Sequence, residues 1–336
     1  MTTRRLPRLL LQAACIAAAL LAASTALAQH PVLLVVNQSS HDLAFVDPSS
    51  AKVVATIPVG GITGHEVAAS PDGKLAYVPI YGDSGVGRPG TDGHTLAVID
   101  IATRKIIRTL DFGHGVRPHC AVFDPVTGML YVTTELDKTV SIVDPHSLKV
   151  VGAIPTGQPE SHMLAVSRDG RRGYTANVHA GTVSVLDLRQ HKTIAVIPIS
   201  AETQRISLSH DDKTAFTADQ TRPRLAVIDT ATNRLRTWVP LPSLAYGTAA
   251  TPDGRWLLVT LRDARQVAIL DLHTMKIART LDVPAGPNEI LVTPDGATAY
   301  VSCFHDNVVA PIDLKQWKVR PAIATGKAAD GLAWAR

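Results

Sequence analysis

Residues 163–197 read MLAVSRDGRRGYTANVHAGTVSVLDLRQHKTIAVI, and this stretch decides the fold. It contains four short apolar or alternating runs, at Met163 to Val166, Gly173 to Asn177, Val183 to Asp187 and Thr193 to Ile197. Turn-forming residues separate the runs, which is typical of β-strands joined by tight turns. The stretch therefore predicts one small sheet of four strands.

The same pattern recurs along the chain. An apolar residue followed by Asp is found at Asp47, Asp100, Asp144, Asp187, Asp229, Asp271 and Asp313, with spacings of 53, 44, 43, 42, 42 and 42 residues. Four strands in about 40–45 residues are the blade of a β-propeller. The sequence predicts an all-β, seven-bladed β-propeller, and the repeated Asp is interpreted as a turn-capping residue.

The two ends of the chain predict how the ring closes. The first blade begins with Val32 to Asn37, which matches the second strand of the other blades, and no first strand precedes it. The segment Asp330 to Ala335 resembles an unpaired first strand. We expect a composite first blade closed by the C-terminal strand, because such a blade leaves no exposed sheet edge inside the ring.

Residues 1–28 have the features of a signal peptide. Arg4, Arg5 and Arg8 precede an apolar run from Leu9 to Leu21, and Ala26-Leu27-Ala28 forms a cleavage site. The run is shorter than the ~20 residues of a spanning helix. We expect cleavage, a periplasmic or secreted protein without stable membrane insertion, and one propeller domain at residues 29–336. A retained membrane anchor is the alternative.

Composition limits the function classes. The chain of 336 residues is 46% hydrophobic and 18% charged, which excludes a disordered protein. Without the first 28 residues, 30 basic side chains face 29 acidic ones, and no basic stripe carries interleaved aromatic residues. We therefore expect no nucleic-acid partner. The partner is either a small molecule at the mouth of the central channel or another protein, and the propeller is expected to be a monomer.

The repeat register brings polar residues to that channel mouth. Seven or eight residues before each turn between the first two strands, the blades carry His65, His119, His162, Gln204, Tyr246 and Asn288, and the 42-residue step extends this series to Asp330. Three imidazoles on consecutive blades suit one divalent metal ion, either zinc, iron or copper, with Glu135 or Glu66 as a general base. The alternative is that these histidines only line a polar, water-filled channel.

Two resemblances to known families rest on short motifs. Tyr131-Val132-Thr133-Thr134 and Ser70-Pro71-Asp72-Gly73 resemble the YVTN-repeat β-propellers, which implies the propeller fold. Arg117-Pro118-His119, with Thr134-Glu135-Leu136, is similar to segments of the propeller lactonases. That similarity implies acid/base catalysis by His119 and Glu135 without a required metal, with Arg117 as a carboxylate anchor.

The sequence leaves two functions open. One is a small-molecule hydrolase or lyase, metal-assisted or lactonase-like, in which Gln204, Tyr246 and Asn288 help to bind the substrate. The other is a noncatalytic scaffold that binds a ligand or a protein. A long insertion, Tyr81 to Gly93, is interpreted either as a lid over the channel mouth or as an ordinary surface loop.

Overall fold

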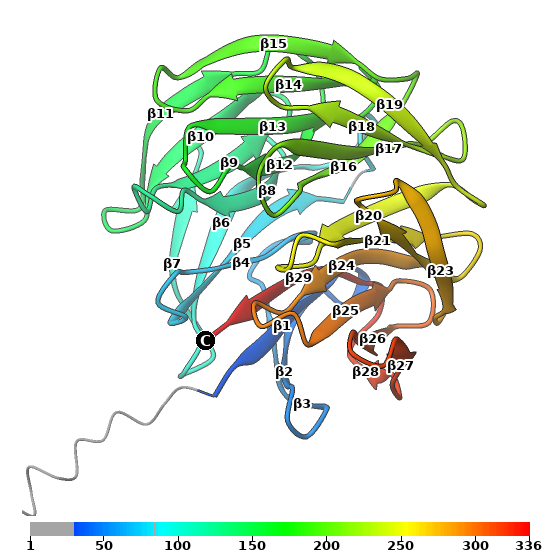
Figure 1. Cartoon of the computed structure of the whole chain (residues 1–336). Helices are drawn as coiled ribbons and strands as arrows, with labels where there is room; N and C mark the ends of the chain where they lie inside the picture. The colour runs from blue at the N-terminus through cyan, green and yellow to red at the C-terminus, as the bar shows by residue number, and fades with distance from the viewer. Residues whose placement is uncertain (1–29, 84) are drawn as a thin grey trace, which may run out of the picture. The chain divides into compact units, whose positions relative to one another are not determined.

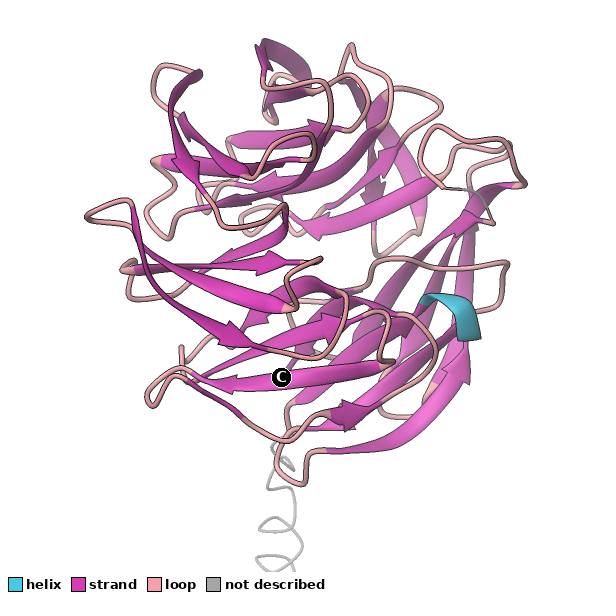
Figure 2. Ribbon diagram, turned by 90° about the vertical axis from the view of Figure 1, so that its right-hand side faces the viewer, coloured by secondary structure: helices cyan, strands magenta, loops and turns pink. Residues whose placement is uncertain are grey.

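The computed structural model describes residues 30–83 and 85–336, and the predicted signal peptide lies outside these residues. Within them, seven small antiparallel sheets surround a common centre, as Figure 1 shows. This arrangement confirms the predicted all-β, seven-bladed propeller. The described residues form only one short helical turn, η1 (Gln38–Ser40), which Figure 2 shows in cyan among strands and loops. None of them forms a helix long and apolar enough to span a bilayer.

Blades 1 to 4 contain the strands between residues 32 and 198, together with the C-terminal strand β29. Blade 1 consists of β29 (Ala329–Ala335), β1 (Val32–Asn37), β2 (Asp42–Asp47) and β3 (Lys52–Pro58). Blade 2 consists of β4 (Ala68–Ala69), β5 (Leu75–Gly82), β6 (Asp92–Asp100) and β7 (Lys105–Asp111). Blade 3 consists of β8 (Pro118–Phe123), β9 (Leu130–Thr134), β10 (Thr139–Asp144) and β11 (Lys149–Pro155). Blade 4 consists of β12 (Ser161–Val166), β13 (Arg172–Asn177), β14 (Thr182–Asp187) and β15 (Lys192–Pro198).

The remaining three blades complete the ring. Blade 5 consists of β16 (Thr203–Leu208), β17 (Thr214–Asp219), β18 (Arg224–Asp229) and β19 (Arg234–Pro240). Blade 6 consists of β20 (Ala245–Ala250), β21 (Trp256–Leu261), β22 (Gln266–Asp271) and β23 (Lys276–Asp282). Blade 7 consists of β24 (Pro287–Val292), β25 (Thr298–Cys303), β26 (Val308–Asp313) and two short outer strands, β27 (Lys318–Val319) and β28 (Ile323–Ala324).

The C-terminal strand closes the ring, as the sequence predicts. β29 pairs antiparallel with β1, and Val32 lies opposite Ala335. β29 also contacts β24 of blade 7 on one side and β4 of blade 2 on the other. Blade 1 is therefore composite, and its innermost strand comes from the opposite end of the chain to its other three strands.

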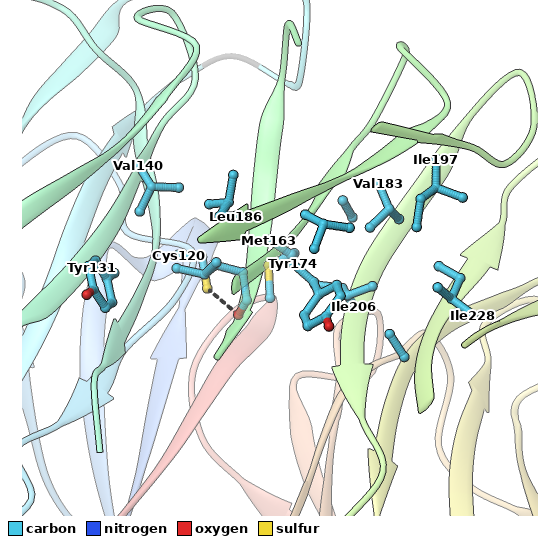
Figure 3. Packing of buried hydrophobic residues seen from close by; sticks show 14 of the residues in the cluster. Cys120, Tyr131, Val140, Met163, Tyr174, Val183, Leu186, Ile197, Ile206 and Ile228 are labelled. Atoms are coloured by element: carbon cyan, nitrogen blue, oxygen red, sulfur yellow. Dashed lines mark hydrogen bonds between the residues drawn. The ribbon is translucent and has the colours of Figure 1, made fainter. Parts of the chain in front are cut away.

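Apolar layers between neighbouring blades hold the ring together. One layer joins blades 3, 4 and 5 and includes Cys120, Tyr174 and Ile206, as Figure 3 shows. Cys120 donates a weak hydrogen bond to the Leu164 carbonyl (3.7 Å), whereas Cys303 lies in another layer, between blades 6 and 7. Both thiols are buried and free. Each sheet buries both faces against its neighbours, which is why inner strands such as β1 are apolar at almost every position.

The repeated Asp caps the turn after the third strand. Asp47 accepts hydrogen bonds from the Ser49 amide (2.9 Å), and Asp144 accepts one from the His146 amide (2.9 Å). A carboxylate at this position satisfies backbone donors that the turn would otherwise leave without partners. The interpretation of this Asp as structural is confirmed.

A β-bulge interrupts the innermost strand at the same register in six blades. The pairing shifts between Pro118 and Ala121 in β8, and equivalent shifts occur in β12, β16, β20, β24 and the β1–β29 pair. A bulge changes the direction in which neighbouring side chains point. Apart from His65, which precedes β4, the predicted channel-mouth positions lie at or beside these bulges, so irregular pairing helps to position the candidate site.

The insertion in blade 2 is part strand and part loop. The sequence places the extra residues in a loop from Tyr81 to Gly93, but β5 continues to Gly82 and β6 begins at Asp92. The pairing of Gly82 with Asp92 extends this hairpin beyond the strand ends of the other blades. The loop proper is therefore shorter than predicted, because the backbone of its two ends is hydrogen-bonded as a ladder.

Candidate functional site

The three channel-mouth histidines lie together. The ring centroids of His65 and His119 are 5.2 Å apart, and those of His119 and His162 are 3.4 Å apart. The ring of Tyr81 lies beside all three, at 4.6 Å from His65, 5.4 Å from His119 and 5.9 Å from His162. All four side chains are buried. We call His65, His119 and His162 the histidine trio.

Glu135 is bound to the histidine trio through His162. Glu135 Oε1 is hydrogen-bonded to His162 Nδ1, and Tyr81 donates its hydroxyl to Glu135 Oε2 (2.7 Å). Glu135 follows β9 in blade 3, whereas His162 lies on β12 of blade 4. The sequence paired Glu135 with His119, which lies in the same cluster without a hydrogen bond between the two among the described contacts. A carboxylate that holds one ring nitrogen fixes the tautomer and the orientation of an imidazole.

Burial keeps two of the imidazoles neutral. Burial lowers the pKa of His65 to about 3, and the neighbouring charge of His162 acts in the same direction. Burial also lowers the pKa of His119 well below its ordinary value, assisted by His162 and His65. The pKa of the Tyr81 hydroxyl is raised by burial and by the charge of Glu135. Neutral imidazoles beside a carboxyl group are typical of sites for acid/base chemistry.

His119 has an unused hydrogen-bonding atom. Its Nδ1 is buried and has no hydrogen-bond partner among the described residues. Buried polar atoms normally have a partner, so an atom without one marks strain, an unseen water or a place for a ligand. Within this cluster, His119 offers a free nitrogen to a reactant.

The histidine trio does not aim its nitrogens at one point. His162 Nδ1 is bound to Glu135, and His65 Nε2 lies 2.8 Å from Gln38 Nε2. In the described chain, no group of three or more His, Cys, Asp or Glu side chains is arranged to hold a metal ion. The three-histidine metal site therefore stays a prediction, and no step proposed below uses a metal.

A second cluster of charges adjoins the histidine trio. Arg205 on β16 places Nη2 at 2.9 Å from Glu66 Oε1 and 3.2 Å from Asp330 Oδ1, and Nη1 at 3.8 Å from Glu289 Oε1. Asn288 donates its amide to Asp330 (2.5 Å). We call these five residues the Arg205 centre. Burial raises the pKa of Glu66, Glu289 and Asp330, although the charge of Arg205 opposes this shift.

The other predicted binding residues border this centre. Tyr246 lies under the Arg205 guanidinium at 5.3 Å, and Gln204 accepts a hydrogen bond from the Arg205 amide (3.2 Å). Arg117 lies at the loop of blade 2, where it binds Asp92 (2.6 Å) and the Arg88 carbonyl (2.8 Å). As placed, Arg117 holds the loop, and its role as a carboxylate anchor stays a prediction.

The loop of blade 2 forms one wall of a small cavity at the channel mouth. The cavity has a volume of about 320 Å³, and Gly87, Arg88 and Arg117 line one side of it, with Glu135 and Glu160 on the other. A Cβ on Gly87 would lie 2.3 Å from Glu160, so the loop passes directly over this residue. A larger cavity of about 760 Å³ lies away from the histidine trio, beside His210 and His273.

Sequence reasoning missed Tyr81 and Arg205 as site residues. Tyr81 is the first residue of the insertion, and it was noted only as a boundary. Arg205 directly follows a register residue, as Glu66 and Glu289 do, and this repeated charge one position later is the signal that could have revealed it. In a regular strand, adjacent residues point to opposite faces, but the bulges bring both to the channel.

The geometry agrees with a comparison to known families. The family described as "Lactonase, 7-bladed beta-propeller" matches residues 88–320, which is more than half of the chain. The chain belongs to this family. The matched segment of this lactonase-family propeller contains His119, Glu135, His162 and Arg205. The finer resemblance to YVTN-repeat propellers stays a prediction.

Two solved structures share the fold of this lactonase-family propeller. Kuenenia stuttgartiensis hydrazine synthase is 21% identical, with a TM-score of 0.73, and the match covers 84% of this chain and 92% of that one. A functionally unknown protein from Desulfotomaculum acetoxidans DSM 771 is 15% identical, with a TM-score of 0.75, and the match covers 91% of this chain and 99% of that one. Among curated sequences, none matches. At these identities, the likeness supports the fold alone.

Proposed function

We propose that the protein is a lactonase-like hydrolase that opens a small lactone ring at the channel mouth without a metal ion. The observation that carries this proposal is the buried pair of Glu135 and His162 beside His119, whose Nδ1 has no partner. Membership of the lactonase propeller family supports the reaction class. The acid/base role that the sequence assigns to His119 passes in this proposal to His162, which Glu135 binds, and His119 instead holds the carbonyl oxygen.

The proposed reaction assigns one task to each side chain. Tyr81 fixes Glu135, and Glu135 orients His162, which takes a proton from the attacking water. The water oxygen bonds to the lactone carbonyl carbon, while neutral His119 hydrogen-bonds to the carbonyl oxygen. The bond between the carbonyl carbon and the ring oxygen then breaks, and His162 returns the proton to that oxygen. The product is the corresponding hydroxy acid, and no other reactant is required.

The cavity beside the loop of blade 2 is the proposed entrance. Its volume of about 320 Å³ is at the lower end of the range for small-molecule sites. Glu135 lines this cavity and also contacts His162, whereas His119 and His162 lie behind it and are not among the lining residues. The proposal therefore has the substrate pass Glu135 to reach the two imidazoles. A substrate of one or two small rings suits this space.

The test is ring opening of unsubstituted γ- and δ-lactones, followed by acid release at constant pH. We expect hydrolysis by the parent protein in the presence of a chelator, and losses of about 10²- to 10⁴-fold in kcat for His162→Ala, His119→Ala and Glu135→Gln. The matched control is Asp111→Asn, which alters the exposed pair of Asp111 and His94 outside the cavity. Parent activity that disappears with chelation, or full activity in Glu135→Gln, contradicts the proposal.

A noncatalytic scaffold is the second candidate, and one observation favours it. Apolar side chains on the outer strands of consecutive blades are exposed, including Ile107 on β7, Val151 on β11 and Val196 on β15. Exposed apolar surface of this kind is typical of protein contacts. If the purified protein hydrolyses no lactone and all four variants above bind ligands as the parent does, the scaffold proposal replaces the enzyme.

Export and assembly state are also proposals. We propose that the protein is released after cleavage and acts in the periplasm or outside the cell as a monomer. N-terminal sequencing of the protein from its native host should begin at Gln29, and light scattering should give the mass of one chain. An uncleaved N-terminus on membrane-bound protein supports the retained anchor instead.

A further inference from the structure

The Arg205 centre contains more negative than positive charge. Three carboxylates, Glu66, Glu289 and Asp330, surround a single guanidinium, and all four side chains are buried or nearly so. A second cation, Arg262, lies over the ring of Tyr246 at 5.0 Å and forms no ion pair with the three carboxylates in the described chain. Charges without full compensation are costly in a buried site, unless a ligand neutralises them.

Hydrogen-bonding atoms without partners gather at this point. In the described part of the chain, six buried side-chain atoms lack a hydrogen bond, and four of them lie in the Arg205 centre or the adjoining histidine trio. They are Asn288 Oδ1, Arg205 Nε and His119 Nδ1, together with Glu66 Oε1, whose polar contact is the ion pair with Arg205 Nη2 at 2.9 Å. Asn288 is 3% exposed, and its amide nitrogen is bound to Asp330, so its carbonyl oxygen is free to accept a bond.

These atoms define the chemistry of a ligand. Asn288 Oδ1 offers a free acceptor, and three carboxyl groups beside it share one guanidinium. Burial raises the pKa of these carboxyls, and a group that donates hydrogen bonds and carries positive charge would stabilise their ionised form. A primary ammonium has three donors and no acceptor. A carboxylate or a phosphate brings more negative charge and more acceptors, which this centre cannot match. The free Nε of Arg205 suits a neighbouring oxygen of the same ligand.

We propose that the Arg205 centre is a subsite for a primary ammonium group of the ligand. The inference deepens the proposed function and rests on it for the reacting ring, which makes an amino-substituted lactone the preferred substrate class. The ammonium binds among Glu66, Glu289 and Asn288, while the lactone carbonyl faces His119. A ligand of this kind gives hydrogen-bond partners to the free atoms of both the Arg205 centre and the histidine trio.

Unreactive probes of one ring size test the subsite separately from catalysis. Cyclopentylamine, cyclopentanol and cyclopentanecarboxylate are titrated calorimetrically into the full protein at pH 7.5. We expect cyclopentylamine to bind at least about tenfold more tightly than the alcohol, and the carboxylate to bind more weakly than both. Equal affinity for the three probes, tighter binding of the carboxylate, or no heat from the amine at 10 mM overturns the proposal.

Two variants and one control locate the amine. Glu289→Gln keeps the side-chain shape and Asn288→Leu removes the free acceptor, and each should weaken amine binding by about tenfold or more. Asp111→Asn alters an exposed carboxylate outside both the Arg205 centre and the cavity and should change the affinity less than twofold. Unchanged amine affinity in the isosteric Glu289→Gln, which tests the site even if Asn288→Leu folds poorly, contradicts the assignment.

The outcomes separate this proposal from the proposed function. Amine binding without hydrolysis of any lactone means that the subsite stands and the hydrolase proposal fails. Hydrolysis of unsubstituted lactones, with no gain in kcat/KM for an α-amino-γ-lactone, means that the hydrolase stands and the subsite fails.

Discussion

At the scale of single residues, Tyr81 connects the loop of blade 2 to the proposed base. Its hydroxyl donates to Glu135, which is hydrogen-bonded to His162. Tyr81→Phe leaves a buried carboxylate oxygen without its donor, so we expect a loss of about 1–3 kcal/mol in stability. We also expect kcat for lactone hydrolysis to fall, because Glu135 is less well fixed. Chemical denaturation and initial rates measure the two effects.

The matched control for this substitution is Tyr77→Phe. Tyr77 is equally buried, on the same strand β5, but its ring packs against Phe123 in the apolar layer. That variant should keep the parent kcat. A Tyr81→Phe protein with parent activity means that the hydroxyl has no part in positioning Glu135.

The buried imidazole of His65 gives a pH dependence of known sign. Its pKa is about 3 in the folded protein and about 6.5 in the unfolded chain, so between these values the unfolded chain binds more protons. Above about pH 6.5, His65 is neutral in both states and does not change the free energy of unfolding. Below that pH, protonation of the unfolded chain lowers the free energy of unfolding by at most about 1.4 kcal/mol per pH unit.

Urea unfolding from pH 7.5 to 4.5 measures this effect. The parent protein should lose stability over this range more steeply than His65→Gln, in which the titrating group is absent and the amide still reaches Gln38. The raised pKa values of the Arg205 centre act in the opposite direction, but they do so in both proteins and cancel in the comparison. Parallel curves for the two proteins are incompatible with a neutral, buried His65.

At the scale of elements, the loop between β5 and β6 closes one side of the entrance. Arg117 binds Asp92 and the Arg88 carbonyl, and Gly87 lies over Glu160. Replacing residues 83–91 by a two-residue turn should leave thermal unfolding nearly unchanged, because surface loops tolerate shortening. We expect KM for the lactone to rise, because a wall of the cavity is removed. An unaltered KM means that the loop is an ordinary surface insertion without a role in substrate binding.

The bulges of the innermost strands explain which parts of the site the sequence reveals. The distance to the turn between the first two strands predicts the common register of His65, His119 and His162, and the structure brings these rings together. This distance cannot predict that Arg205 also faces the channel, because the bulge that turns it is a local change in pairing. The partnership of Glu135 with His162 depends on two neighbouring blades, so spacing within one blade does not reveal it.

At the scale of the whole molecule, the repeat predicts nearly all of the fold. Strand order, blade number and the composite blade follow from the spacing of Asp47 to Asp313 and from the unmatched runs at each end. The difference lies in blade 2, where the ladder of β5 and β6 continues into the insertion. No periodic signal marks that extension, because it occurs once.

Ring closure by β29 leads to a prediction about stability. Ending the chain after Thr325 removes β29, together with the buried side chains of Leu332 and Ala333, and exposes the edge of β1. We expect the truncated protein to be insoluble or to unfold without a cooperative transition. The control lacks only Arg336, which lies outside β29. Calorimetry that shows the parent transition in the longer deletion contradicts closure by this strand.

The composite blade also sets an order of events during synthesis and folding. Val32 and Ala335 are paired although 303 positions separate them in the chain. While the ribosome still holds β29, six blades can assemble, but β1 has no inner neighbour and the circle stays open. Long-range pairing of this kind slows folding, and the unpaired edge of β1, which could pair with another chain, stays exposed for longer. Until β29 is released, the unpaired edge of β1 is therefore open to a chaperone that binds extended backbone.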